Sequence, residues 1–204
     1  MNRDLVMGAT LTPNAYSRRW FELFLDEYPP AQTARDVAFL QRQLPLPPYT
    51  KILDLCCGNG RHATAMAEIG YDVTGVDKDE IAIARASSTQ VSSVKFVAND
   101  IREYLQCGHQ FDAVTIMWQS FGFFEPNGNR DLLGQIRDSL RPGGRLILDI
   151  YNREFYAKNH QSERNIAVGQ ISVSETWVLK GNRLEVTLKY DKLGVETDSG
   201  LQAI

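Results

Sequence analysis

The amino-acid sequence predicts an α/β fold: a doubly wound, mainly parallel sheet with helices on both faces, an N-terminal helical cap and a C-terminal β-hairpin. Short apolar runs alternate with helical stretches between residues 50 and 151. A glycine-containing loop follows the first of these runs, and strict alternation of apolar and polar residues appears only near the C-terminus. Strands that are apolar throughout and separated by helices are typical of a parallel sheet covered on both faces.

Residues 1–48 form the predicted helical cap. Apolar residues recur with helical spacing over residues 14–44, with a break at Pro29 and Pro30. The sequence PLPP at residues 45–48 ends this zone, because proline cannot continue a helix.

Residues 49–155 form the predicted Rossmann-like core. Right-handed crossovers between its parallel strands place a ligand cleft beyond their carboxyl ends. The expected strands are 51–57, 72–77, 94–100, 111–118 and 145–151, and the expected helices are 61–69, 79–90 and about 128–140.

Residues 156–204 form the predicted C-terminal extension. The segment 171–192 alternates strictly between apolar and polar residues on either side of KGN at 180–182, which is typical of a β-hairpin. The residues after Lys192 carry little pattern, and we expect them to be loosely held. We expect the three parts to make one compact domain.

The composition is that of a globular protein, with 43% hydrophobic and 23% charged residues among 204. A formal net charge of −3 gives no general attraction to polyphosphate, so we expect no nucleic-acid partner. The sequence shows neither a signal peptide nor a run of transmembrane length, so we expect a cytoplasmic protein without a membrane partner. Cys56, Cys57 and Cys107 have neither metal-ligand nor disulfide-framework spacing, which predicts reduced thiols and no metal site.

The loop after the first strand has the spacing G-x-G-x-x-A, with Gly58 and Gly60 in the turn and Ala63 in the following helix. Such a turn lets backbone amides approach a ligand closely. Asp77 ends the second strand, where a carboxylate can accept hydrogen bonds from both ribose hydroxyls of an adenosine. The loop and the acid predict a nucleoside-containing ligand but do not choose between a nicotinamide dinucleotide and S-adenosylmethionine.

Two further carboxylates separate these ligands. Asp54 lies four residues before Gly58, where an anion disfavours pyrophosphate and suits the cationic sulfonium and ammonium of S-adenosylmethionine. Asp100 lies just past the third strand, where it could accept the adenine amino proton while the Ile101 amide meets the ring.

The motifs LDLCCGNGRHA, GYDVTGVDKDE, VANDIREY, FDAVTIMWQSFGFF and LRPGGRLILDIYNREFY together resemble class I S-adenosylmethionine-dependent methyltransferases. They are most similar to the bacterial small-molecule subset with an N-terminal helical cap and a β-hairpin insertion after strand five. The resemblance implies S-adenosyl-L-methionine as cofactor and S-adenosyl-L-homocysteine as product. The cofactor-binding residues it implies are Asp54, Gly58, Gly60, Arg61, Asp77, Lys78, Asp100, Ile101, Trp118 and Gln119. For Arg61, pairing with the methionine carboxylate and an exposed position without a role are both open.

Methyl transfer from a sulfonium mainly requires an aligned nucleophile and exclusion of water, and the catalytic residue is unknown. His160 and Tyr16 are weak candidates for a general base. The acceptor is expected to be a small molecule methylated on N, O or C. The candidate substrate-lining residues are Tyr16, Trp20, Phe121, Phe123, Tyr151 and Asn152.

Two alternative functions and one structural question stay open. The first alternative function is an NAD(P)-dependent oxidoreductase, which Asp54 and the lack of a Tyr-x-x-x-Lys pair disfavour. The second is an inactive methyltransferase remnant that still binds the cofactor. The structural question concerns the edge of the parallel sheet. Either the hairpin pairs with the fifth strand, or that strand is exposed and can pair with a second copy of the chain in a homodimer.

Overall fold

The computed structural model describes residues 24, 28–108, 110–159, 163–168, 171–181, 183–191 and 196–203. These residues divide between two compact units, one within residues 22–151 and the other within residues 152–204. The domain boundaries predicted at residues 48 and 155 stay predictions. Tyr16, Trp20 and His160 lie outside the described residues.

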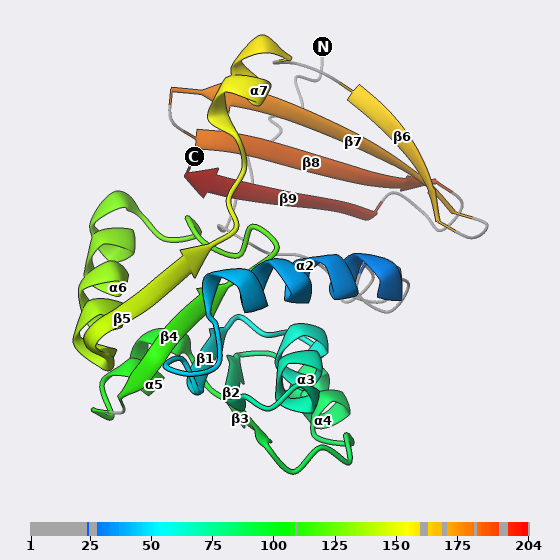
Figure 1. Cartoon of the computed structure of the whole chain (residues 1–204). Coiled ribbons are helices and arrows are strands. Elements are labelled where there is room, and N and C mark those ends of the chain that lie inside the picture. Colours follow the sequence, from blue (N-terminus) through cyan, green and yellow to red (C-terminus); the bar gives the residue numbers. More distant parts are fainter. Residues whose placement is uncertain are drawn as a thin grey trace, which may run out of the picture. The chain divides into compact units, whose positions relative to one another are not determined.

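The first unit is built on a five-stranded parallel sheet in the order β3-β2-β1-β4-β5 (Figure 1). The order of the strands and their parallel direction confirm the predicted doubly wound sheet. Its strands are β1 (Lys51–Leu55), β2 (Asp72–Asp77), β3 (Val94–Ala98), β4 (Phe111–Ile116) and β5 (Leu140–Leu148). Its helices are α2 (Pro30–Gln43), α3 (Arg61–Glu68), α4 (Glu80–Ala86), α5 (Ile101–Leu105) and α6 (Pro126–Ser139).

Both faces of the sheet are buried because neighbouring strand residues point into different clusters. Ile52 packs with Leu40 of α2 and Met66 of α3, and Leu53 packs with Leu105 of α5 and Ile136 of α6. All of these side chains except Leu105 are fully buried. This two-sided burial explains why the central strands β1 and β4 are mostly apolar and why the chain alternates strand with helix.

The segment RPGG lies inside β5 and does not separate α6 from the strand as expected. Phe111 pairs with Leu140, but Ala113 pairs with Arg145, so β5 contains an irregularity at residues 141–144. Gly143 has a φ of +81°, a conformation that glycine adopts without a steric penalty. The strand nevertheless pairs in parallel with β4 from Arg145 onward, as predicted.

The second unit is a four-stranded antiparallel sheet in the order β6-β7-β8-β9. The predicted hairpin is confirmed: Lys180 of β7 pairs with Arg183 of β8 across a two-residue turn. The expectation of a loosely held tail is wrong, because its backbone forms a strand paired with β8. The elements are α7 (Arg153–Lys158), β6 (Glu163–Val168), β7 (Ile171–Lys180), β8 (Arg183–Asp191) and β9 (Glu196–Ala203).

The helix α7 contacts this sheet through Trp177 of β7. The Trp177 indole Nε1 donates to the backbone oxygen of Asn159 at 3.2 Å, and its ring meets Tyr156 edge-on at 5.8 Å between centroids. The hairpin belongs to this second sheet, so the alternative in which it closes the parallel sheet is wrong. Among the described strands, β5 is the edge beyond β4.

Candidate cofactor site

In the loop between β1 and α3, three alternate residues have a left-handed backbone conformation. Cys56, Gly58 and Gly60 have φ values of +58°, +54° and +77°. A Cβ added to Gly60 would lie 2.4 Å from Cζ of Phe96, so this position needs glycine for both conformation and packing. The loop therefore begins α3 at Arg61, close against the sheet.

Asp77, the last residue of β2, fastens this loop. Its Oδ2 accepts the Gly58 amide at 2.8 Å, and its Oδ1 accepts the Asp79 amide at 3.0 Å. Burial raises the pKa of this carboxyl above its usual value. Each carboxylate oxygen can accept a second hydrogen bond, so Asp77 retains capacity for ligand hydroxyls. The neighbouring Lys78 is exposed.

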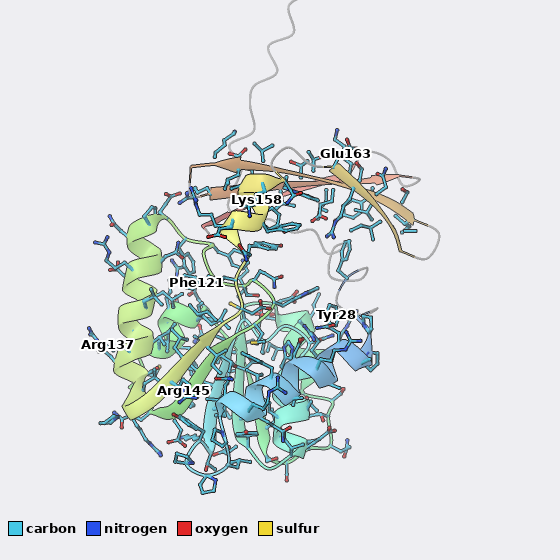
Figure 2. All side chains as sticks on the ribbon, turned by 45° about the horizontal axis from the view of Figure 1, so that its top comes forward. Tyr28, Phe121, Arg137, Arg145, Lys158 and Glu163 are labelled. Carbon is cyan, nitrogen blue, oxygen red and sulfur yellow. The ribbon has the colours of Figure 1, made fainter. Side chains whose placement is uncertain are left out.

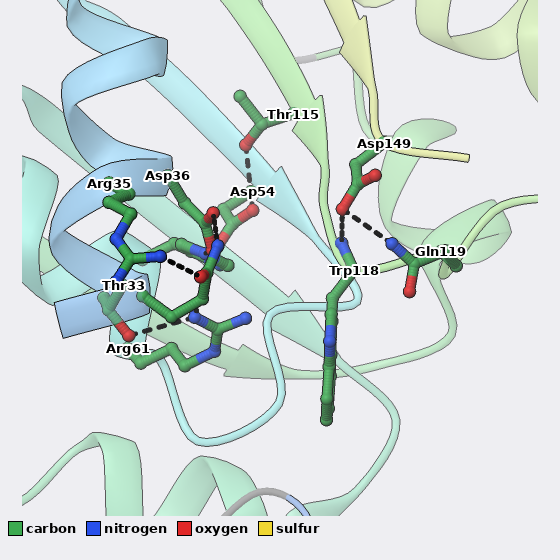
Figure 3. A network of polar contacts seen from close by, with 11 residues as sticks. Thr33, Arg35, Asp36, Asp54, Arg61, Thr115, Trp118, Gln119 and Asp149 are labelled. Carbon is green, nitrogen blue, oxygen red and sulfur yellow. Dashed lines mark hydrogen bonds and ion pairs between the residues drawn. The ribbon is translucent and has the colours of Figure 1, made fainter. Parts of the chain in front are cut away.

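Asp54 of β1 is buried, with 2% of its surface exposed. Its Oδ1 accepts a hydrogen bond from the Thr115 hydroxyl at 2.8 Å (Figure 3). Its Oδ2 is buried and has no hydrogen-bond partner within the described part of the chain. Burial raises the pKa of Asp54 to about 7, while the charge of Arg61 opposes this rise. A buried, half-satisfied carboxylate of this kind favours a cationic ligand group.

Arg61, the first residue of α3, is held by the cap helix α2. Its Nη1 donates to Thr33 Oγ1 at 3.0 Å and lies 3.4 Å from Asp36 Oδ2. Figure 3 shows Arg61 near these α2 side chains. The guanidinium carbon lies 4.0 Å from the centre of the Tyr28 ring. Only 13% of the Arg61 side chain is exposed, so the alternative of an exposed arginine is wrong.

The second amino group of Arg61, Nη2, is buried and lacks a hydrogen-bond partner among the residues described. Buried polar groups are rarely left unpaired, and a guanidinium pairs best with a carboxylate. The end of the sheet thus offers an acceptor on Asp54 and a donor on Arg61, matching the ammonium and carboxylate of an amino acid.

His62 is buried and contacts the same α2 carboxylate. Its Nε2 lies 3.0 Å from Asp36 Oδ2, and burial holds the pKa of the imidazole below its usual value. Hydrogen bonds from His62 and Gln32 lower the pKa of Asp36, although burial opposes this. A neutral His62 therefore donates through Nε2–H to an ionised Asp36.

Trp118 and Gln119, in the loop after β4, both have a φ of +55°, a region that non-glycine residues rarely occupy. Asp149, the residue after β5, stabilises this conformation. Its Oδ2 accepts the Trp118 amide at 3.0 Å and Gln119 Nε2 at 2.9 Å. The Trp118 ring meets Tyr28 edge-on at 4.9 Å between centroids and lies 5.4 Å from the Arg61 guanidinium.

Asp100 and Ile101 begin α5 beyond β3. Asp100 caps the helix by accepting the Arg102 amide at 2.8 Å, and it pairs with the Arg102 guanidinium at 2.6 Å. The pairing lowers the pKa of Asp100 and keeps it ionised. An adenine amino group would share this carboxylate with Arg102, whose guanidinium lies 4.3 Å from the Phe124 ring centre.

The predicted substrate-lining residues differ in their surroundings. Phe121 and Phe123 are half-buried in the loop after β4, and Figure 2 shows Phe121 toward the carboxyl end of that strand. Tyr151 is half-buried in the first unit. Asn152 caps α7 through its Oδ1, which accepts the amides of Glu154 and Phe155, so this side chain has a structural role in the second unit.

The adjacent cysteines behave as packing residues. Burial raises the pKa of both the Cys56 and Cys57 thiols far above the usual value, and the charges of Asp54 and Asp77 raise it further. A thiolate is the nucleophilic form of cysteine, so neither residue is suited to attack a substrate.

The sequence pattern missed four residues of this network: Asp149, Asp36, Thr33 and Tyr28. Asp149 follows the apolar end of β5, and Asp54 and Asp77 likewise lie near or at the ends of their strands, so the same signal could have found it. The other three lie in or just before α2, and only tertiary packing brings them to Arg61.

Residues 52–144 match a family model described as a methyltransferase domain. The putative methyltransferase YqeM of Bacillus subtilis is 34% identical over 110 residues, which are 52% of this chain and 44% of that protein. The mitochondrial ubiquinone biosynthesis O-methyltransferase of Schizosaccharomyces pombe is 34% identical over 115 residues, covering 53% of this chain and 40% of that protein. The chain thus spans about half the length, or less, of these curated relatives.

Solved structures share the fold. CalS10, an amino pentose methyltransferase from Micromonospora echinaspora with S-adenosylmethionine bound, superposes with a TM-score of 0.69 at 20% identity, covering 94% of this chain and 84% of that one. The CcbJ methyltransferase from Streptomyces caelestis gives a TM-score of 0.71 at 17% identity, covering 87% and 76%. The described helices include none long and apolar enough to cross a membrane.

Proposed function

We propose that this protein transfers a methyl group from S-adenosyl-L-methionine to a nucleophilic N, O or C atom of a small molecule, because residues 52–144 match the family model of a methyltransferase domain. The observation that carries the proposal is that two buried atoms, Asp54 Oδ2 and Arg61 Nη2, have no hydrogen-bond partner among the described residues. Together they complement an amino-acid group, which S-adenosylmethionine has and a nicotinamide dinucleotide lacks.

The residues of the site fit the cofactor in three places. Asp54 and Arg61 would hold the ammonium and carboxylate of the methionine part. Asp77 would accept the ribose hydroxyls with the capacity left beside the Gly58 amide. Asp100 and Ile101 would meet the adenine edge, and Trp118 and Gln119 would flank the amino-acid end.

When bound, the cofactor supplies an activated methyl group on a sulfonium. The work left to the chain is to align the acceptor and exclude water. The aromatic residues Trp118, Phe121 and Phe123 in the loop after β4 suit both tasks, because aromatic rings attract a cationic methyl donor and exclude water. Within the described residues we assign no general base.

A small-molecule acceptor is supported by the relatives and by the charge of the chain. One curated relative is named trans-aconitate 2-methyltransferase, at 30% identity over 123 residues. The net charge of −3 gives no general attraction to nucleic acid. We propose a cytoplasmic location, because the spacing of Cys56, Cys57 and Cys107 predicts reduced thiols and not a disulfide framework.

Thermal unfolding with S-adenosylhomocysteine or NADH tests the cofactor, because a ligand that binds only the native state raises the melting temperature. We expect a shift with S-adenosylhomocysteine and its loss in Asp77→Ala. A shift with NADH alone would overturn the proposal in favour of an oxidoreductase. Turnover assays across amines, phenols and carboxylates then identify the acceptor class, and failure with every class would favour an inactive binding protein.

A further inference from the structure

The conformation of Arg61 is set by α2 and not by its own helix. An arginine side chain has several rotatable bonds, and fixing them costs about 2 kcal/mol of rotamer entropy. Here Thr33 Oγ1 and Asp36 Oδ2 both lie within reach of Nη1, at 3.0 and 3.4 Å, and the Tyr28 ring lies against the guanidinium. These contacts use one amino group of Arg61 and leave the other, Nη2, without a hydrogen-bond partner in the described chain.

Asp36 is itself fixed from two further directions. Gln32, one helical turn earlier, donates to Oδ1 at 2.9 Å, and His62 of α3 contacts Oδ2 at 3.0 Å. The side chain of Asp36 is 19% exposed, so these contacts are only partly screened by solvent. Asp36 is thus a fixed, ionised acceptor and not a mobile surface carboxylate.

We propose that Asp36 and Thr33 are positioning residues that direct Nη2 of Arg61 toward the carboxylate of the cofactor's amino-acid part. The inference rests on the proposed function. If so, α2 contributes to the binding affinity of ligands that carry this carboxylate and contributes nothing to the affinity of ligands that lack it. Neither Asp36 nor Thr33 need touch the cofactor, because Arg61 transmits their effect.

Two ligands separate positioning from simple stability. S-adenosylhomocysteine has the amino-acid group, and 5′-methylthioadenosine keeps the adenosine and the sulfur but lacks it. Isothermal titration calorimetry gives the dissociation constant of each ligand for the wild type, Asp36→Asn and Thr33→Val. Thr33→Val keeps the shape of the side chain and replaces the hydroxyl with a methyl group, so it serves if Asp36→Asn fails to fold.

We expect Asp36→Asn to weaken S-adenosylhomocysteine about tenfold or more and Thr33→Val to weaken it about threefold, because both perturb hydrogen bonds to a charged group. Binding of 5′-methylthioadenosine should change by less than about twofold. Asp112→Asn is the matched control. Asp112 also pairs with an arginine, Arg141 at 2.8 Å, but it lies near the start of β4 and should leave the ratio of the two affinities unchanged.

A double-mutant cycle with Arg61→Ala completes the test. If Asp36 acts through Arg61, adding Asp36→Asn to Arg61→Ala should cause no further loss of S-adenosylhomocysteine affinity. Equal weakening of both ligands, unchanged affinities, or additive losses in the cycle would overturn the inference and leave the proposed function intact. A wild-type protein that binds neither ligand would overturn the proposed function and this inference with it.

Discussion

At the scale of single residues, Asp54 determines how the proposed site responds to pH. Its pKa is raised to about 7 by burial, so the unliganded carboxyl loses its charge as the pH falls through that value. A bound ammonium group requires the charged form. We therefore expect the affinity for S-adenosylhomocysteine to be about tenfold lower at about pH 6 than at about pH 8, as calorimetry would measure.

The variant Asp54→Asn isolates this effect, because it keeps the shape and removes the titration. Its affinity should be lower at pH 8 and should not share the pH dependence of the wild type. The stability of the unliganded protein should change with pH in the opposite direction to the affinity. Because the native pKa of Asp54 lies above the unfolded value of 3.8, the melting temperature of the wild type should fall relative to Asp54→Asn as the pH rises from 3.8 to about 7. A wild-type affinity that is flat across this pH range would contradict the assignment.

Whether a site residue can be predicted from the sequence depends on whether its strand or only tertiary packing brings it to the site. Asp54 and Asp77 could be found because each lies at or near the carboxyl end of an apolar strand, where parallel strands collect their ligand-binding residues. Asp36 could not, because it contacts Arg61 only through the packing of α2 on α3. A carboxylate in a helix usually marks the solvent-exposed face of that helix, and no spacing rule identifies its partner 25 residues away.

At the scale of elements, the loop between β1 and α3 depends on the missing side chain at Gly60. A Cβ there would lie 2.4 Å from Cζ of Phe96, and the φ of +77° is strained for any other residue. We expect Gly60→Ala to lower the free energy of unfolding by about 2–4 kcal/mol, the sum of a left-handed conformation and an overpacked contact. Urea denaturation measures this change.

Gly134 in α6 provides the matched control, because nothing lies within 4 Å of its added Cβ and its φ is not positive. Gly134→Ala should stabilise the protein by about 0.5–1 kcal/mol, since alanine favours a helix interior. Shortening Phe96 to leucine in the Gly60→Ala protein should recover the packing part of the loss and leave the conformational part. Equal effects at the two glycines would refute the argument from Phe96.

Sequence patterns predicted elements where burial imposed them and failed where backbone pairing alone did. The central strands β1 and β4 are buried on both faces, and the apolar runs gave the order of the five core strands along the chain correctly. The strand β9, with the sequence ETDSGLQA, has no alternation to reveal it and is held by its ladder to β8. The irregularity in β5 was hidden because RPGG is equally typical of a turn.

At the scale of the whole molecule, the division into two compact units separates cofactor binding from the C-terminal sheet. Every residue assigned here to the cofactor lies in the unit within residues 22–151. The second unit has its own core, in which Val173, Trp177 and Leu184 are buried. A unit with its own core can open and close with its own equilibrium constant.

Hydrogen exchange with and without S-adenosylhomocysteine measures whether the units are thermodynamically independent. A ligand bound to one unit stabilises that unit by RT ln(1 + [L]/Kd), so at a hundredfold excess over Kd the globally exchanging amides of β1 and β4 should slow by about a hundredfold. The amides of β7 and β8 should exchange at unchanged rates. Equal slowing in both sheets would show that the units unfold together, and slowing confined to β7 and β8 would place the ligand in the second unit and contradict the site assigned to Asp54 and Arg61.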